Sequence, residues 1–205
     1  GNPSIQVTYD NGSGSASPSF HSKDLVFANN EFLAVGYSVV HRENSIAVRS
    51  SDGVNWTFAG FMDNSSNQSA EAVAYGTGKY VAMRSGRSWV SDNGSSWSLG
   101  NPSIQVTLDN GSVVTFQAKD LVFANNEFLA VGTAGGSIAV RSTDGVNWSF
   151  AGIIDNSTDN ITAVAYGNGK YIAMGNWRKF ESRSLADAPP HGGSIPLHDL
   201  KLNPK

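Results

Sequence analysis

The sequence predicts an all-β protein with the architecture of a β-propeller. Two segments return almost unchanged: residues 1–12 come back at 100–111, and residues 23–36 come back at 119–132. A shorter pattern of apolar strand, two-residue turn and apolar strand occurs four times, with a period of roughly 40 to 50 residues that is typical of four-stranded propeller blades. The composition, with 40% hydrophobic residues, 22 Gly and only 15% charged residues, suits short strands joined by turns. We therefore expect four blade units, arranged as a tandem duplication of a two-blade half with extended terminal strands.

Each unit is expected to contain a tight hairpin. The turn residues tolerate a positive φ, as two-residue hairpin turns require. The four turns are Asn29-Asn30, Thr77-Gly78, Asn125-Asn126 and Asn168-Gly169. A further strand follows, such as 45–50 or 137–142, and then a turn and a Trp.

These elements predict three parts of the chain. Residues 1–19 form an N-terminal connecting strand and linker, and residues 20–187 form the repeat domain. Residues 188–205 form a Pro/Gly linker and a strand-forming tail. The four units of the repeat domain are expected at about 20–69, 70–118, 119–160 and 161–187.

The turn before the Trp recurs in three of the units. An Asp in such a turn accepts backbone N–H groups, a Gly supplies the positive φ, and the Trp packs beneath the loop. The residues expected in these roles are Asp52, Gly53, Trp56, Asp92, Gly94, Trp97, Asp144, Gly145 and Trp148. Together with the hairpin 163–174, they give the chain a motif set that resembles the Asp-box repeats of bacterial sialidase-like β-propellers, over about residues 20–180.

The resemblance implies a propeller fold and a structural role for the Asp-box turns. Sialidase chemistry uses an arginine cluster, a Tyr/Glu nucleophile pair and an acidic Asp. The best matched arginines, Arg49 and Arg141, occupy one repeat position twice, which favours a structural role. Glu31 and Glu127 are interpreted as solvated turn carboxylates, and the repeated aspartates 24 and 120 as turn or capping groups. No catalytic residue is therefore predicted, and the chain is expected not to be an enzyme.

The ends of the chain predict self-assembly. The strand at residues 4–9 has no blade before it, and Ser194-Ile-Pro-Leu197 parallels Ser103-Ile-Gln-Val106. An unpaired strand exposes backbone groups that can pair within the ring or with another chain. The expected assembly residues are Ile5, Val7, Ile195, Leu197, Leu200 and Leu202. The main functional hypothesis is thus an extracellular structural protein that joins copies of itself head to tail into a fibre or surface layer by strand donation.

Two alternative functions involve carbohydrate. The first is a lectin-like, carbohydrate-binding propeller, and the second is a sialidase-like glycosidase. Trp89 and Trp177 are the predicted glycan-stacking residues. Turns rich in Asn also supply possible N-glycosylation sites. These are Asn11, Asn55, Asn64, Asn67, Asn93, Asn110, Asn147, Asn156 and Asn160.

Other classes of partner receive no support from the sequence. The net charge is −3 without a cluster of basic residues, so nucleic acid is not an expected partner. No stretch approaches the roughly 20 apolar residues of a membrane span. Cysteine is absent, which excludes disulfides and thiolate metal sites, and the four histidines show no recurring spacing. No metal site and no cofactor are predicted.

Overall fold

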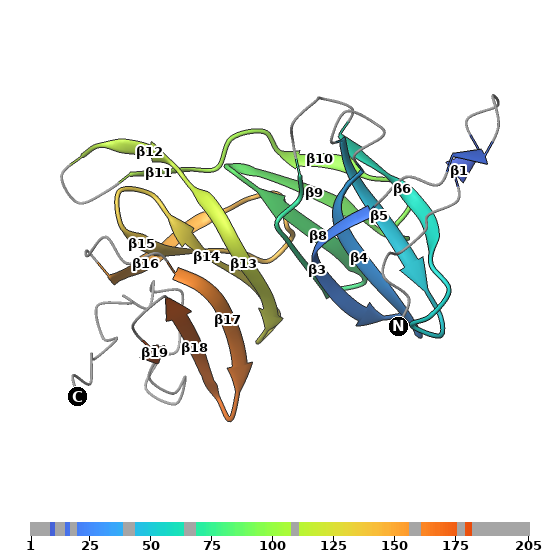
Figure 1. Cartoon of the computed structure of the whole chain (residues 1–205). Helices are drawn as coiled ribbons and strands as arrows, with labels where there is room; N and C mark the ends of the chain where they lie inside the picture. Colours follow the sequence, from blue (N-terminus) through green and yellow to red (C-terminus); the bar gives the residue numbers. More distant parts are fainter. Residues whose placement is uncertain are drawn as a thin grey trace.

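The computed structural model describes residues 9–10, 15–16, 20–38, 44–63, 69–107, 111–155, 161–175 and 179–181. Within these ranges all of the regular secondary structure is β-strand, which confirms the predicted all-β class (Figure 1). No helix in the described part of the chain is long and apolar enough to cross a membrane. The sheets follow one another along the chain as successive antiparallel units, and we call the four larger ones blades 1 to 4.

The odd-numbered blades are the two copies of one four-stranded sheet. Blade 1 contains β3 (Phe20–Ala28), β4 (Glu31–Ser38), β5 (Asn44–Ser50) and β6 (Thr57–Asp63). Blade 3 contains β13 (Gln117–Ala124), β14 (Glu127–Thr133), β15 (Ser137–Ser142) and β16 (Ser149–Asp155). The pairing register repeats as well, including a bulge in the first strand of each sheet.

The even-numbered blades are the second kind of sheet. Blade 2 contains β7 (Ala72–Gly76), β8 (Lys79–Arg84), β9 (Arg87–Ser91) and β10 (Ser98–Asn101). Blade 4 contains β17 (Ile161–Gly167), β18 (Lys170–Gly175) and β19 (Lys179–Glu181) within the described residues. The matching pairs β7–β8 and β17–β18 place Met83 and Met174 at equivalent positions.

The turns at the tips of the first hairpins adopt the predicted backbone conformation. Asn29 and Asn30 have φ of 52° and 63°, and Asn125 and Asn126 have φ of 53° and 61°. Thr77 and Asn168 have φ of 50°, each followed by a Gly with positive φ. The hairpin prediction is confirmed at all four sites, because the strands on either side of each turn are paired with each other.

The first strands of the blades lie next to one another in chain order. Strand β3 packs against β7, β7 against β13, and β13 against β17. Within the described residues, β17 does not pack against β3 in the same way, and Figure 1 shows blades 1 and 4 at opposite ends of a row. The four blades thus form an open arc.

The segment predicted as a single connecting strand between the two halves is one strand of a hairpin. Strand β11 (Gln105–Thr107) pairs with β12 (Val113–Thr115), and, before blade 1 in the sequence, β1 (Tyr9–Asp10) pairs with β2 (Ser15–Ala16). The β11–β12 hairpin is tied to blade 2 by a hydrogen bond from the Ile104 N–H to the Gly86 carbonyl. Val106 and Phe116 bury their side chains at the junction of blades 2 and 3.

In the described residues, three of the four clusters of buried side chains lie in the seams between blades, and the fourth, formed by Phe20, Ala34, Ile46 and Val48, lies on the face of blade 1 that points away from blade 2. Each seam is filled by side chains from the facing surfaces of two sheets. Trp89 and Tyr80 fill the seam of blades 1 and 2, and Phe128 fills that of blades 2 and 3. Consequently a blade is stable only next to another blade.

Candidate functional site

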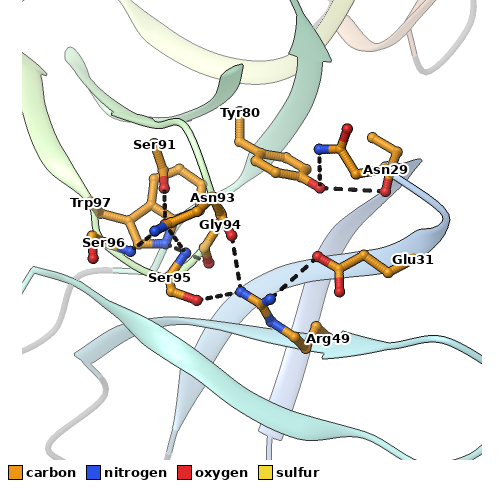
Figure 2. Close-up of polar contacts among 11 residues, drawn as sticks. Asn29, Glu31, Arg49, Tyr80, Ser91, Asn93, Gly94, Ser95, Ser96 and Trp97 are labelled. Atoms are coloured by element: carbon orange, nitrogen blue, oxygen red, sulfur yellow. Dashed lines mark hydrogen bonds and ion pairs between the residues drawn. The ribbon is translucent and has the colours of Figure 1, made fainter. Parts of the chain in front are cut away.

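The seam between blades 1 and 2 carries a polar cluster at the edge where the hairpin turns lie (Figure 2). The Asn29 side chain donates from Nδ2 to the Tyr80 hydroxyl at 3.3 Å and accepts from the Tyr75 hydroxyl at 3.1 Å. The two tyrosine rings are 4.7 Å apart and tilted by 57°. Burial raises the pKa of Tyr80, whose hydroxyl donates at 3.4 Å to the Ala28 carbonyl. The turn of blade 1 is thus fastened to the first hairpin of blade 2.

Arg49 makes a second link across the same seam. Its Nη1 lies 3.4 Å from a carboxylate oxygen of Glu31, in its own blade. Its Nη2 donates to the Asn93 carbonyl at 3.0 Å and to the Ser95 hydroxyl, both in the turn of blade 2 (Figure 2). The interpretation of Glu31 as a solvated carboxylate is wrong, since its side chain is only 23% exposed and paired with Arg49.

The Asp-Gly-Trp turns of blades 1 and 3 have the same hydrogen bonds. Asp52 Oδ1 accepts from the backbone N–H groups of Val54 and Asn55, each at 2.8 Å, and Trp56 Nε1 donates to the Gly53 carbonyl at 3.2 Å. The hydrogen bonds from Asn55, first of all from its backbone, hold the pKa of Asp52 well below its ordinary value of 3.8. These contacts are the ones expected of an Asp that organises a tight turn.

Asp144 repeats the pattern in blade 3. Its Oδ1 accepts from the backbone N–H groups of Val146 and Asn147, each at 2.8 Å, and Trp148 Nε1 donates to the Gly145 carbonyl at 3.0 Å. Burial acts to raise the pKa of Asp144, but these hydrogen bonds outweigh it and the pKa lies well below 3.8.

In blade 2 the role expected of Asp92 belongs to Asn93. Asn93 Oδ1 accepts from the backbone N–H groups of Ser95 and Ser96, each at 2.9 Å. Asp92 is exposed and one residue out of register with Asp52 and Asp144. Gly94 and Trp97 keep their expected places, with Trp97 Nε1 donating to the Gly94 carbonyl at 3.1 Å.

The seam between blades 3 and 4 repeats half of the polar cluster. Asn125 donates to the Tyr171 hydroxyl at 3.4 Å and accepts from the Tyr166 hydroxyl at 3.0 Å. Burial raises the pKa of Tyr171 to about 12. Burial also raises the pKa of Glu127, against the opposing effects of Arg141 and Tyr171. An amide, two phenols, a carboxyl and a guanidinium therefore converge on one partly exposed edge.

The two polar seams differ at the position that the arginine faces. In blade 2, Asn93 and Ser95 supply the acceptors for Arg49. The sequence that follows the last described strand of blade 4 is Ser182-Arg-Ser-Leu-Ala-Asp187, which has no Asn-Gly. Among the described residues, no contact of the Arg49 kind joins Arg141 to blade 4.

The repeated aspartates 24 and 120 fasten neighbouring blades together rather than capping turns. Asp24 Oδ2 accepts from the Val73 N–H at 2.8 Å, and Asp120 Oδ2 accepts from the Val164 N–H at 2.6 Å. Burial raises the pKa of both carboxyls, and the backbone hydrogen bonds offset part of that effect. Each aspartate sits at the bulge of its strand, which turns the side chain toward the next blade.

The structure describes some of the residues predicted to bind glycans, to carry glycans or to mediate assembly, and leaves others outside the described ranges. Trp89 is 2% exposed, so its ring lies in the core and has no face for a sugar, which makes that prediction wrong. Asn55 and Asn147 are exposed, but each donates its Nδ2 to the Asp of its own turn. Several predicted positions lie outside the described residues: Trp177, the sequons at Asn11, Asn64, Asn67, Asn110, Asn156 and Asn160, and the assembly residues Ile5, Val7, Ile195, Leu197, Leu200 and Leu202.

No group of three or more His, Asp or Glu side chains in the described ranges could hold a metal ion. The carboxylates of the site are instead paired with arginine or with backbone N–H groups.

The sequence matches no protein-family model, and no curated protein matches it. Solved structures do resemble the fold. An exo-β-1,3-galactanase from Phanerochaete chrysosporium, solved with β-1,3-galactotriose, has a TM-score of 0.58 at 14% identity, over 94% of this chain and 53% of that chain. YCF48 bound to D1 peptide has a TM-score of 0.56 at 13% identity, over 81% and 52%. Trypanosoma rangeli sialidase with the inhibitor DANA has a TM-score of 0.52 at 14% identity, over 86% and 38%.

These likenesses establish a β-propeller, sialidase-like fold, as the sequence predicts. The chain spans about half of the length of the galactanase and of YCF48. They also correct the prediction that the chain is not an enzyme, because glycosidases from several sources share this fold. At this level of identity the likenesses show the fold alone, which is that of a β-propeller.

Proposed function

We propose that the chain is a carbohydrate-binding propeller whose glycan site is the seam between blades 3 and 4. The alternative prediction of a lectin-like propeller is preferred over the predicted fibre because the similar structures include a galactanase with a bound galactotriose and a sialidase. The extracellular location stays a prediction from composition.

The observation that carries the proposal is the contact of Arg49 with the Ser95 hydroxyl. Together with the contact to the Asn93 carbonyl, it indicates that an arginine at this repeat position binds a hydroxyl and a carbonyl oxygen. Arg141 occupies the equivalent position next to Glu127 and Tyr171. A sugar presents hydroxyl groups that can accept from a guanidinium and donate to a carboxylate, as the Ser95 hydroxyl can. Tyr166, which is only partly buried, adds an aromatic face for the apolar side of a sugar ring.

The chain contains its own control for this proposal. Arg49 and Arg141 are the same residue at the same repeat position, but Arg49 is already bound to the turn of blade 2. We expect Arg141→Ala to weaken glycan binding at least about tenfold, which corresponds to about 1.4 kcal/mol. Arg49→Ala should leave binding unchanged, since its contacts are internal to the protein.

The measurement is a glycan array followed by isothermal titration of the strongest ligand, with β-1,3-galactotriose as the first oligosaccharide tested. Circular dichroism of both variants checks that they are folded. Equal affinity of the Arg141→Ala variant and the unmodified protein would contradict the proposed site. Absence of binding across the array would contradict the proposed function.

A second candidate function is glycoside hydrolysis at the same seam. It is favoured by Glu127, because burial raises the pKa of its carboxyl, and a raised pKa is typical of the general acid that protonates a glycosidic oxygen. Under this hypothesis Glu127→Gln abolishes release of a chromogenic aglycone but preserves binding of the oligosaccharide. Unchanged hydrolysis in that variant would exclude Glu127 as the acid.

A further inference from the structure

In the seam between blades 1 and 2, the turn of blade 2 presents two neutral oxygen atoms to one arginine nitrogen. The Asn93 carbonyl accepts from Nη2 of Arg49 at 3.0 Å, and the Ser95 hydroxyl accepts from the same nitrogen (Figure 2). The other terminal nitrogen, Nη1, lies 3.4 Å from the Glu31 carboxylate. The turn thus shows which ligand atoms suit an arginine at this position: an amide carbonyl oxygen and a hydroxyl oxygen close to it.

The place that this turn occupies is narrow. Gly94 stands between the two accepting residues, and a Cβ added to it would lie 2.5 Å from Leu33 and 3.3 Å from the Tyr80 ring. Leu33 and Tyr80 are fully buried and belong to the apolar cluster of the seam. A bare peptide group therefore fits over this apolar floor, and a side chain at the same point does not.

The seam between blades 3 and 4 has the same floor. Leu129 lies opposite Arg141 in the strand register, just as the leucine of blade 1 lies opposite its arginine. Tyr171 is only partly buried, whereas the equivalent Tyr80 is 0% exposed. The repeat has thus kept the arginine, the leucine and the tyrosine, and less of the tyrosine is covered.

The acid of this seam has a different partner from the acid of the first seam. Besides the burial that raises its pKa, the Glu127 carboxyl has a hydrogen bond with the Tyr171 hydroxyl. In the part of the chain that the structure describes, no ion pair of the Arg49–Glu31 kind joins Glu127 to Arg141. A ligand carboxylate next to Arg141 would be repelled by Glu127 in its ionised form, so a neutral pair of acceptors suits the site better.

N-acetylated amino sugars carry this pair of acceptors. An acetamido group on one ring carbon supplies an amide carbonyl, and the next ring carbon carries a hydroxyl. The acetamido group has the size of a single peptide group without a side chain, and its methyl group can pack on an apolar floor. The rigid ring also holds the amide and the hydroxyl at a fixed spacing, so less conformational entropy is lost than when a free peptide adopts a turn.

We infer that the ligand of the seam between blades 3 and 4 is a glycan that contains an N-acetylated amino sugar. Arg141 donates to the acetamido carbonyl and to the neighbouring hydroxyl, and the acetamido methyl packs on Leu129 and Tyr171. This inference rests on the proposed function, because it names the sugar that the proposed glycan site takes. The turn of blade 2 is the internal counterpart of that sugar.

The test compares neutral sugars that differ in one substituent. Two pairs of methyl β-glycosides are used, N-acetylgalactosamine with galactose and N-acetylglucosamine with glucose, and their affinities for the whole chain are measured by titration in NMR. In at least one pair we expect the acetamido sugar to bind at least about tenfold more tightly, because only that sugar offers an amide carbonyl to the charged donor. This comparison is made on the unmodified chain, so it does not depend on the folding of any variant.

The arginine that reads the amide is tested by the repeat. In the Arg141→Ala variant the ratio of the two affinities should fall to about one, because the donor to the acetamido carbonyl is gone. Arg49→Ala is the matched control and should keep the ratio of the unmodified chain, since Arg49 binds the turn of blade 2. Circular dichroism checks that both variants are folded.

The outcomes distinguish this inference from the proposed function. Equal binding of the sugars within both pairs, weakened alike by Arg141→Ala, would overturn the inference and leave the glycan site in place. A preference for the acetamido sugar that survives in Arg141→Ala would also overturn it, since another group would then bind the amide. So would tighter binding of methyl glucuronide, which offers a carboxylate, or of the peptide acetyl-Asn-Gly-Ser-amide, which copies the turn. Absence of binding by every sugar, including those of the glycan array, would overturn the proposed function together with the inference.

Discussion

A pair of glycines at one repeat position allows the seam packing to be tested quantitatively. The perturbation is Gly76→Ala, with Gly167→Ala as the matched control. The Cβ added at residue 76 would lie 2.1, 2.2 and 2.4 Å from three atoms of the Phe123 ring. Carbon atoms in packed interiors are about 3.5–4.0 Å apart, so the ring would have to move by more than about 1 Å. Phe123 cannot move freely because it packs against Phe128 and the buried seam.

Overpacking of this kind destabilises by about 1–3 kcal/mol. In a domain of this size, each kcal/mol lowers the Tm by about 2–4 °C, so the Tm should fall by roughly 2–12 °C. Gly167→Ala meets no atom within 4 Å and restricts the unfolded chain, so it should be neutral or stabilise by up to about 1 kcal/mol.

The assay is urea unfolding followed by tryptophan fluorescence, with the unmodified chain and the two variants measured side by side. Equal free energies of unfolding for the two variants would refute the reasoning, because it would mean that the seam between blades 2 and 3 is not packed as described. A destabilised Gly167→Ala variant would show that blade 4 is covered within one chain.

Three further predictions concern the polar groups of the turns and seams. The pKa of the Asp144 carboxyl lies below 3.8 in the folded protein, so the contribution of this carboxylate to stability is full above that pH and is lost as the pH falls through the folded-state pKa. The Asp144→Asn variant should therefore lose less stability than the unmodified chain between about pH 4 and about pH 2, measured by urea unfolding at each pH. Asp120→Ala should lower the free energy of unfolding by about 1–3 kcal/mol because it leaves the Val164 N–H without its acceptor, whereas Asp120→Asn should cost less; equal losses would contradict the role of that hydrogen bond. Trp97→Phe removes the donor to the Gly94 carbonyl and should destabilise by about 0.5–1.5 kcal/mol in thermal unfolding, and an unchanged Tm would mean that the indole acts only through its packing.

Much of the candidate site could be placed from the sequence, but its contacts could not. The repeat placed Arg49 and Arg141 at one position, and Glu31 and Glu127 beside the hairpin turns. Which of these carboxylates would meet an arginine depends on side chains that neighbouring strands of a blade bring together. The sequence therefore suggested a solvated Glu31, and only the strand register of β4 and β5 shows its ion pair with Arg49.

Trp89 illustrates the same limit for the core. A tryptophan outside the recurring turn suggested an exposed ring, but residues on one blade face are buried or exposed according to the blade that faces them. The wrong assignment of Asp92 has a more local cause. Asn93 can accept the same turn hydrogen bonds as an Asp, and only the position relative to Ser91 distinguishes the two residues.

The sequence alone determined the all-β class, the repeat, the four hairpin turns and the turns that end in a tryptophan. These depend on interactions within a few residues, such as a positive φ at Asn29 or the hydrogen bonds of Asp52 to the next residues of its own turn. The tertiary structure decided the open arc, the links of Asp24 and Asp120 to the next blade, and the exposure of Phe27 against the burial of Phe123. Identical sequence repeats have identical local preferences, so only the presence or absence of a neighbouring sheet can make one copy core and the other surface.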